Sequence, residues 1–192
     1  VLVGLGRIGK LVARRLLLHN SAGLNWVGAV ELTRDPELFS YTLNYDSTYG
    51  TLDTRVEHTT DSLRIRGLND VPLFDDLTLA IEETSPDLVV DCSGSQKSAE
   101  ILLSRERTRF KRHLFAQPLD LIKRDNDSRV WVYGVNDSDF DRLKIPRNII
   151  NPGCLNNCLI PLIACLNEQN KIMKGSFVSV HSVTNTQPTL DR

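Results

Sequence analysis

The chain has 192 residues, of which 41% are apolar and 24% charged, and its formal net charge is −1. This composition is ordinary for a globular protein of one medium domain, or one domain and part of a second, and the near-neutral charge disfavours nucleic acid or an anionic membrane as a main partner. No apolar run approaches 18 residues and no signal-peptide pattern is present, so a cytoplasmic protein is expected. The four cysteines show no CxxC pairing, which argues against a metal site.

The first twenty residues, VLVGLGRIGKLVARRLLLHN, predict a short buried strand, a tight turn and an amphipathic helix. Gly4, Gly6 and Gly9 form the pattern G-x-G-x-x-G at that turn. Such glycines permit the turn, let the backbone approach a pyrophosphate and let the helix pack on the strand, while the helix N-terminus offers free N–H groups to the anion. The pattern therefore indicates a dinucleotide-binding loop.

The β-branched run at 24–32 predicts the next strand of a parallel sheet, with Glu31 near its end. Glu31 lies 22 residues after Gly9, the spacing at which a carboxylate accepts hydrogen bonds from the ribose hydroxyls. This position favours NAD over NADP. The alternative is a solvated glutamate at the end of a strand.

The middle of the chain alternates predicted helices and strands, which indicates an α/β fold with a parallel sheet. We expect helices at 35–50, 76–86 and 98–110, short antiparallel strands within 55–74, strands at 87–94, 111–118 and 130–136, and a polar loop at 119–129. Ser93 and Gly94 follow the strand at 87–94, so they are expected at the crevice that binds the dinucleotide.

The stretch INPGCLNNCLIPLIACL, residues 150–166, places Cys154 where a loop turns into an apolar helix interrupted by Pro161. A helix N-terminus lowers a thiol pKa, and a nucleophilic thiolate needs a basic partner. His181, in a strand expected at 174–187, is the best-placed histidine. A buried structural cysteine and a surface histidine are the alternatives, and Cys158, one helical turn on, is expected to serve packing.

Six motifs, in this order, resemble the glyceraldehyde-3-phosphate dehydrogenase family across essentially the whole chain. They are VGLGRIGKLVAR, YDSTYG, VVDCSG, YGVN, NPGCLNNCLIPL and VHSVTNTQPTLD. The resemblance implies a Rossmann-type, doubly wound NAD-binding domain at 1–150 and the beginning of a mixed α/β catalytic domain at 151–192. The chain reads like a piece of a longer protein, because most of that family's catalytic domain follows this point. YGVN and CLIPLI lean toward the erythrose-4-phosphate dehydrogenase branch.

The resemblance also implies site residues and a reaction. Gly4, Gly6, Arg7, Ile8 and Gly9 match the family's dinucleotide loop, Cys154 its nucleophile, His181 its base, and Thr184 a threonine that holds substrate phosphate. The implied activity is NAD-dependent oxidation of an aldehyde phosphate through a thiohemiacetal and a thioester, in a homotetramer.

Three departures from the family pattern bear on that activity. Gly153 and Leu155 replace a serine and a threonine that flank the nucleophile, and Glu31-Leu32 replaces an Asn-Asp pair. A hydrogen bond to a charged group is typically worth about 1.5–3 kcal/mol, so the lost hydroxyls weaken a site for inorganic phosphate. A divergent paralogue that keeps nucleotide binding for a regulatory role is therefore the alternative. A semialdehyde dehydrogenase is disfavoured by YDSTYG and HSVTNTQ.

Overall fold

The computed structural model describes residues 1–19, 23–104, 112–117, 126–138 and 145–181. Their helices are α1 (Arg7–Leu18), α2 (Pro36–Asn44), α3 (Leu77–Thr84), α4 (Gln96–Leu103) and α6 (Cys154–Gln169). The strands are β1 (Leu2–Val3), β2 (Ala29–Val30), β3 (Tyr45–Asp46), β4 (Gly50–Thr51), β5 (Val56–His58), β6 (Ser62–Ile65), β7 (Val71–Phe74), β8 (Leu88–Asp91), β9 (Arg112–Phe115), β10 (Ser128–Val130) and β11 (Asn148–Ile150).

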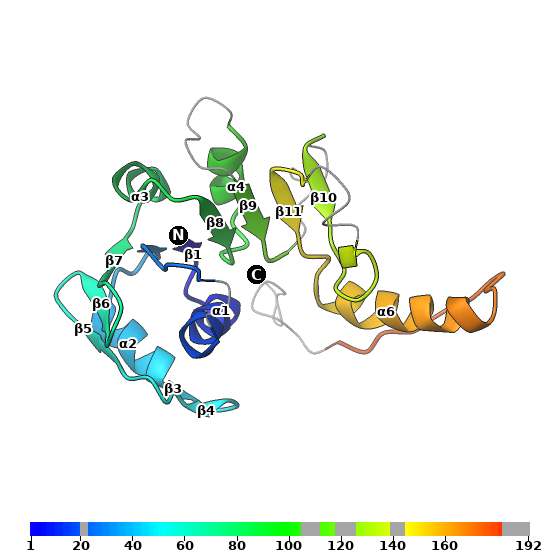
Figure 1. Cartoon of the computed structure of the whole chain (residues 1–192), viewed down its shortest axis with the longest axis horizontal. Coiled ribbons are helices and arrows are strands. Elements are labelled where there is room, and N and C mark those ends of the chain that lie inside the picture. The colour runs from blue at the N-terminus through cyan, green and yellow to red at the C-terminus, as the bar shows by residue number, and fades with distance from the viewer. Residues whose placement is uncertain (20–22, 105–111, 118–125, 139–144, 182–192) are drawn as a thin grey trace, which may run out of the picture.

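Nine of these strands form one sheet in the order β10-β11-β9-β8-β1-β2-β7-β6-β5, drawn in Figure 1. The strands from β10 to β7 are parallel to their neighbours, whereas β7, β6 and β5 are antiparallel. β3 and β4 form a separate hairpin. The expected α/β fold with a mostly parallel sheet is confirmed, as are the antiparallel strands within 55–74.

Helices cover both faces of the sheet, as a doubly wound fold requires. One buried cluster joins β1 and β2 to α1 and α2 through Leu2, Ala13, Ala29, Phe39 and Leu43. A second cluster on the other face joins the sheet to α3 and α4 through residues that include Val3, Phe74, Ala80, Ala99 and Leu102. The sheet is thus the middle layer of three.

The helix predicted at 35–50 starts as expected but ends early, at Asn44. Asp35 caps it by accepting from the backbone N–H of Leu38 at 2.9 Å. Asn44 closes it because its amide pairs with both backbone groups of Val56, at 2.7 and 2.9 Å. Asp46 then accepts from the N–H groups of two following residues, which fixes the β3–β4 hairpin.

Several other predicted boundaries differ from the structure. β2 is much shorter than the strand expected at 24–32, and β10 precedes most of the strand expected at 130–136. There the chain turns, because the Asn136 side chain accepts from the N–H of Val132 and donates to the carbonyl of Val130. β11 was not predicted. Much of the helix expected at 98–110 and of the loop expected at 119–129 lies outside the described residues.

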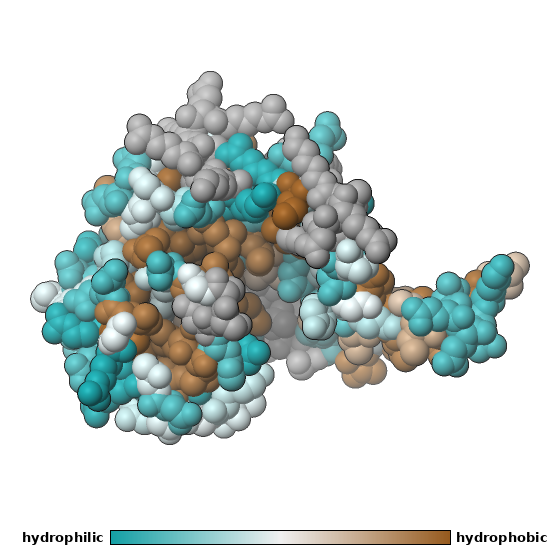
Figure 2. Space-filling model, in the orientation of Figure 1, coloured by the Kyte–Doolittle hydropathy of each residue, from teal (hydrophilic) through white to brown (hydrophobic). Residues whose placement is uncertain are grey.

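α6 projects from the sheet and has no buried residue (Figure 1). Pro161 does not interrupt it, although proline removes one hydrogen bond from a helix. Its exposed apolar side chains include Leu162, Ile163 and Leu166. In Figure 2, brown surface lies near the base of the projection, whereas its outer end is mostly teal. Residues 174–181 run back along it without forming the predicted strand. No described helix is long and apolar enough to cross a membrane.

Candidate active site

The loop between β1 and α1 has the geometry that the glycine pattern predicts. Gly4 has φ +82°, and a Cβ there would lie 2.7 Å from Ser93 Cα; a Cβ on Gly9 would lie 1.8 Å from the Gly4 carbonyl oxygen. Gly6 is the N-cap of α1, and a Cβ on it would meet no atom within 4 Å. The open helix N-terminus leaves room for a pyrophosphate beside free backbone N–H groups, so the loop fits a dinucleotide. Arg7 and Ile8, in the first turn of α1, are both exposed.

Glu31 directly follows β2, and its carboxylate lies against this loop. One oxygen accepts from the backbone N–H of Leu5 at 2.7 Å, and the other from that of Leu32 at 2.9 Å. A carboxylate has about four lone-pair positions, so both oxygens keep acceptor capacity for a ligand. The Leu32 side chain is 87% exposed and supplies no polar group at the place where the resemblance expects aspartate.

A small cavity of about 130 Å³ opens at the carboxyl ends of β1, β2, β7 and β8. Its lining comprises Val3, Gly4, Val30, Glu31, Leu32, Asp75, Asp76, Leu77, Ser93, Ser95, Lys97, Ser98 and Ile101. Cavities that enclose a whole ligand usually measure about 300–1,000 Å³, so this one fits only a part of a dinucleotide. Glu31, Gly4 and Ser93 lie together here, as the sequence predicted from the strand ends.

Ser93 is held by Asp91, a residue that sequence reasoning did not single out. The Asp91 Oδ1 atom accepts from the Ser93 backbone N–H at 2.8 Å and from its hydroxyl at 2.6 Å. Burial raises the pKa of Asp91, and its Oδ2 atom is buried without a hydrogen-bond partner. A carboxylate as the last residue of an apolar strand was the available signal. Asp91 thus orients the Ser93–Gly94 turn, where the Gln117 side chain packs against Gly94.

Cys154 begins α6, directly after Gly153 as N-cap. Its Sγ lies 3.2 Å from Nε2 of His181, which belongs to the extended segment 174–181. The contact with His181 lowers the pKa of the Cys154 thiol, and the backbone N–H of Leu155 lowers it further. The structure therefore brings the two residues together, and Cys154 is exposed. Cys158 is exposed, which contradicts its expected role in packing.

The thiol and the glycine loop occupy the same edge of the sheet. β1, β8, β9 and β11 are successive parallel neighbours, so their carboxyl ends all point to one side. The glycine loop follows β1, the Ser93–Gly94 turn follows β8, and Cys154 follows β11 after a three-residue loop. Ligands of parallel α/β sheets bind at this edge. Thr184 lies outside the described residues.

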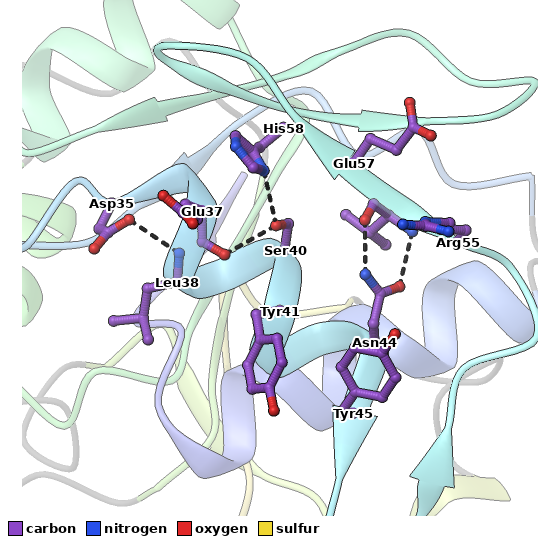
Figure 3. A pocket seen from close by; sticks show the side chains of 11 residues that line it. Asp35, Glu37, Leu38, Ser40, Tyr41, Asn44, Tyr45, Arg55, Glu57 and His58 are labelled. Atoms are coloured by element: carbon purple, nitrogen blue, oxygen red, sulfur yellow. Dashed lines mark hydrogen bonds between the residues drawn. The ribbon is translucent and has the colours of Figure 1, made fainter.

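A wider hollow of about 800 Å³ lies between α2 and β5, shown in Figure 3, and contains no predicted site residue. Its inner polar groups are already hydrogen-bonded within the protein. The Ser40 hydroxyl lies 3.1 Å from His58 Nδ1, and the Asn44 amide pairs with the Val56 backbone. We therefore assign the site to the sheet edge and not to this larger hollow.

Two family models and several curated proteins match the sequence of the chain. Residues 1–99 match the family model described as glyceraldehyde 3-phosphate dehydrogenase, NAD binding domain, and residues 153–192 match the C-terminal domain of the same family. Over 98% of its length, the chain is 31% identical to glyceraldehyde-3-phosphate dehydrogenase 2 of Staphylococcus epidermidis, of which it covers 53%. It is also 31% identical, over 98% of its length, to a glyceraldehyde-3-phosphate dehydrogenase of Clostridium pasteurianum, of which it covers 54%. It is 30% identical to glyceraldehyde-3-phosphate dehydrogenase 1 of Giardia intestinalis, with 54% covered. The chain thus spans about half the length of these curated relatives.

Proposed function

The chain belongs to the glyceraldehyde-3-phosphate dehydrogenase family, and we propose that its protein oxidises an aldehyde phosphate with NAD, using Cys154 as nucleophile and His181 as base. The observation that carries the proposal is the 3.2 Å contact between the Cys154 thiol and the His181 imidazole. Cys154 follows β11 at the carboxyl edge of the sheet, the edge from which the glycine loop also leaves β1, and this common edge supports a thiol and a dinucleotide acting on one substrate.

NAD is the cofactor that the family match supports, and the residues of the sheet edge fit it. Backbone N–H groups of the Gly4–Gly9 loop, with Arg7 and Ile8, would hold the pyrophosphate, and Glu31 would accept from ribose hydroxyls. Ser93 and Gly94 would flank the dinucleotide at the end of β8. When bound, NAD supplies the acceptor for a hydride.

The proposed chemistry of the chain begins with the Cys154 proton. His181 takes it at Nε2, and the resulting thiolate attacks the aldehyde carbon to form a thiohemiacetal. Backbone N–H groups at the start of α6 would stabilise the oxyanion, which would then receive the proton back from His181. The same imidazole would take the hydroxyl proton again as the carbon gives up its hydride to the acceptor that NAD would supply and becomes a thioester on Cys154.

Release of the thioester is where this chain differs from the family pattern. Gly153 has no side chain, and Leu155 presents a partly exposed apolar one. Both positions therefore lack the hydroxyls that the resemblance places beside the nucleophile. We propose that inorganic phosphate binds weakly here and that release by phosphate is slow. The departures do not touch the thiol–imidazole pair, which nucleotide binding alone would not require, so we do not propose a purely regulatory paralogue.

The remaining assignments rest on the family. We propose that residues 1–150 form the NAD-binding domain and that residues 151–192 belong to the catalytic domain, with Thr184 contacting substrate phosphate. A homotetramer in the cytoplasm is the assembly and location that the resemblance supports. A small aldehyde phosphate is the proposed substrate, with glyceraldehyde 3-phosphate and erythrose 4-phosphate as the two to compare.

The decisive experiment combines NAD calorimetry with a rapid-mixing assay of NADH formation from each aldehyde phosphate. We expect NAD binding and a burst of NADH in the unmodified protein. Cys154→Ser should keep NAD binding and lose the burst, whereas Cys165→Ser, on the same exposed helix, should keep both. NAD binding without NADH formation that depends on Cys154 would exclude the proposed enzyme.

A further inference from the structure

The cavity at the end of β2 is lined by two acidic residues in addition to Glu31, the expected ribose ligand. We propose that Asp75 and Asp76, at the end of β7, share with Glu31 the rejection of a 2′-phosphate, so that selectivity for NAD over NADP survives the loss of Glu31. The inference rests on the proposed function and adds two specificity-determining residues to it. Both aspartates line the cavity together with Glu31.

The sheet register places Asp75 beside Glu31. β2 and β7 are parallel neighbours in which Val30 pairs with Phe74, and the Glu31 backbone N–H donates to the Phe74 carbonyl at 2.8 Å. Glu31 and Asp75 are the next residues of the two strands. A phosphate on a ribose hydroxyl held by Glu31 would therefore lie at the edge that Asp75 also occupies.

Asp76 is fixed by its role in the fold. Its carboxylate caps α3 by accepting from the backbone N–H of Leu79 at 2.9 Å. The cap points the side chain to the α3 N-terminus, at the carboxyl edge of the sheet, and leaves its negative charge at the cavity lining. The fold itself thus holds the Asp76 carboxylate in place, and no contact with a ligand is needed to position it.

The charges of the cavity do not cancel. The residues that line the cavity include three acids, Glu31, Asp75 and Asp76, and one base, Lys97. Among the residues that the structure describes, the side-chain ion pair is Arg64–Asp70, so no salt bridge neutralises the three acids. An extra dianionic phosphate here would be repelled, and like-charge juxtaposition is an established way to reject a competing ligand. Glu31 supplies only part of that repulsion.

The test measures the dissociation constants of NAD and NADP by calorimetry for the unmodified protein, Glu31→Gln, and the triple variant Glu31→Gln/Asp75→Asn/Asp76→Asn. Asparagine caps helices about as well as aspartate, so the fold should be kept, and the melting temperature checks this. Asp35→Asn is the matched control, because Asp35 caps α2 with the same 2.9 Å geometry outside this cavity.

We expect Glu31→Gln to strengthen NADP binding about tenfold while NAD remains preferred. The triple variant should strengthen it by a further factor of about ten or more, and added salt should narrow the NAD preference of the unmodified protein because it screens exposed charges. Asp35→Asn should change neither constant. Equal NADP affinity in the triple variant and Glu31→Gln would overturn the inference alone, as would loss of all selectivity in Glu31→Gln. Absence of NAD binding in the unmodified protein would overturn the proposed function and the inference with it.

Discussion

Alkylation of Cys154 should be the fastest among the exposed cysteines of α6, and its pH midpoint should lie below that of a free thiol. The structural reason is the contact of 3.2 Å with His181, which favours the thiolate. A free thiol of pKa about 8.5 is only about 3% thiolate at pH 7, so ionisation alone can raise the rate at most about thirtyfold. Iodoacetamide labelling at a series of pH values, read by mass spectrometry for each cysteine, measures both quantities.

The control residues and a second variant make this test specific. Cys158 and Cys165 lie exposed on the same helix, so access to the reagent does not explain a faster reaction at Cys154. His181→Gln removes the imidazole and should move the Cys154 midpoint up toward about 8.5. Equal rates at the three cysteines, or a midpoint that does not respond to His181→Gln, would refute the reasoning from the thiol–imidazole pair.

Three further predictions concern the fold around the site. Gly9→Ala should lower the free energy of unfolding in urea by about 1–3 kcal/mol, because its Cβ would lie 1.8 Å from the Gly4 carbonyl oxygen. Gly6→Ser should change this free energy by less than about 0.5 kcal/mol, and equal effects of the two variants would contradict the steric argument. Arg14→Met should lower the free energy of unfolding by about 2–4 kcal/mol, because buried Arg14 donates to three backbone carbonyls. An equal loss for Arg15→Met, at an exposed position, would contradict this reason. Burial raises the pKa of Asp91, so the contribution of this residue to stability is full below the unfolded-state pKa of about 3.9 and is lost as pH rises. The melting temperature of the unmodified protein, relative to that of Asp91→Asn, should therefore fall from pH 4 to pH 7. A difference that stays constant over this range would contradict the prediction.

The elements that the sequence predicts best are those whose signals are local. The G-x-G-x-x-G loop needs only neighbouring residues, and the helix start at Asp35 depends on a cap that acts within one helical turn. The end of α2 was missed because Asn44 pairs with Val56, twelve residues away, and this contact is invisible to a periodicity pattern. β11 was missed for a similar reason: three residues become a strand only because β9 and β10 lie on both sides of them.

The same difference between local signals and contacts of distant residues applies to the candidate site. Cys154 could be placed from its helix start, but its pairing with His181 joins residues 27 apart, and spacing alone left a structural cysteine as an alternative. Asp91 and Asp75 were not selected, because a carboxylate at a strand end has no distinctive pattern until the neighbouring strand is known. The register of β2 and β7 supplies that knowledge for Asp75.

Gly153 links the departures from the family pattern to backbone geometry. Its φ of 90° and ψ of 168° lie in a region essentially restricted to glycine, where another residue typically costs about 1–3 kcal/mol. A serine at this position would therefore strain the turn that brings Cys154 to the start of α6. Leu155 is different, because it lies within the helix with its side chain 39% exposed, where a threonine would fit. The proposed weakness of the phosphate site thus has a backbone cause at one position and a side-chain cause at the other, and neither requires a change in the thiol–imidazole pair.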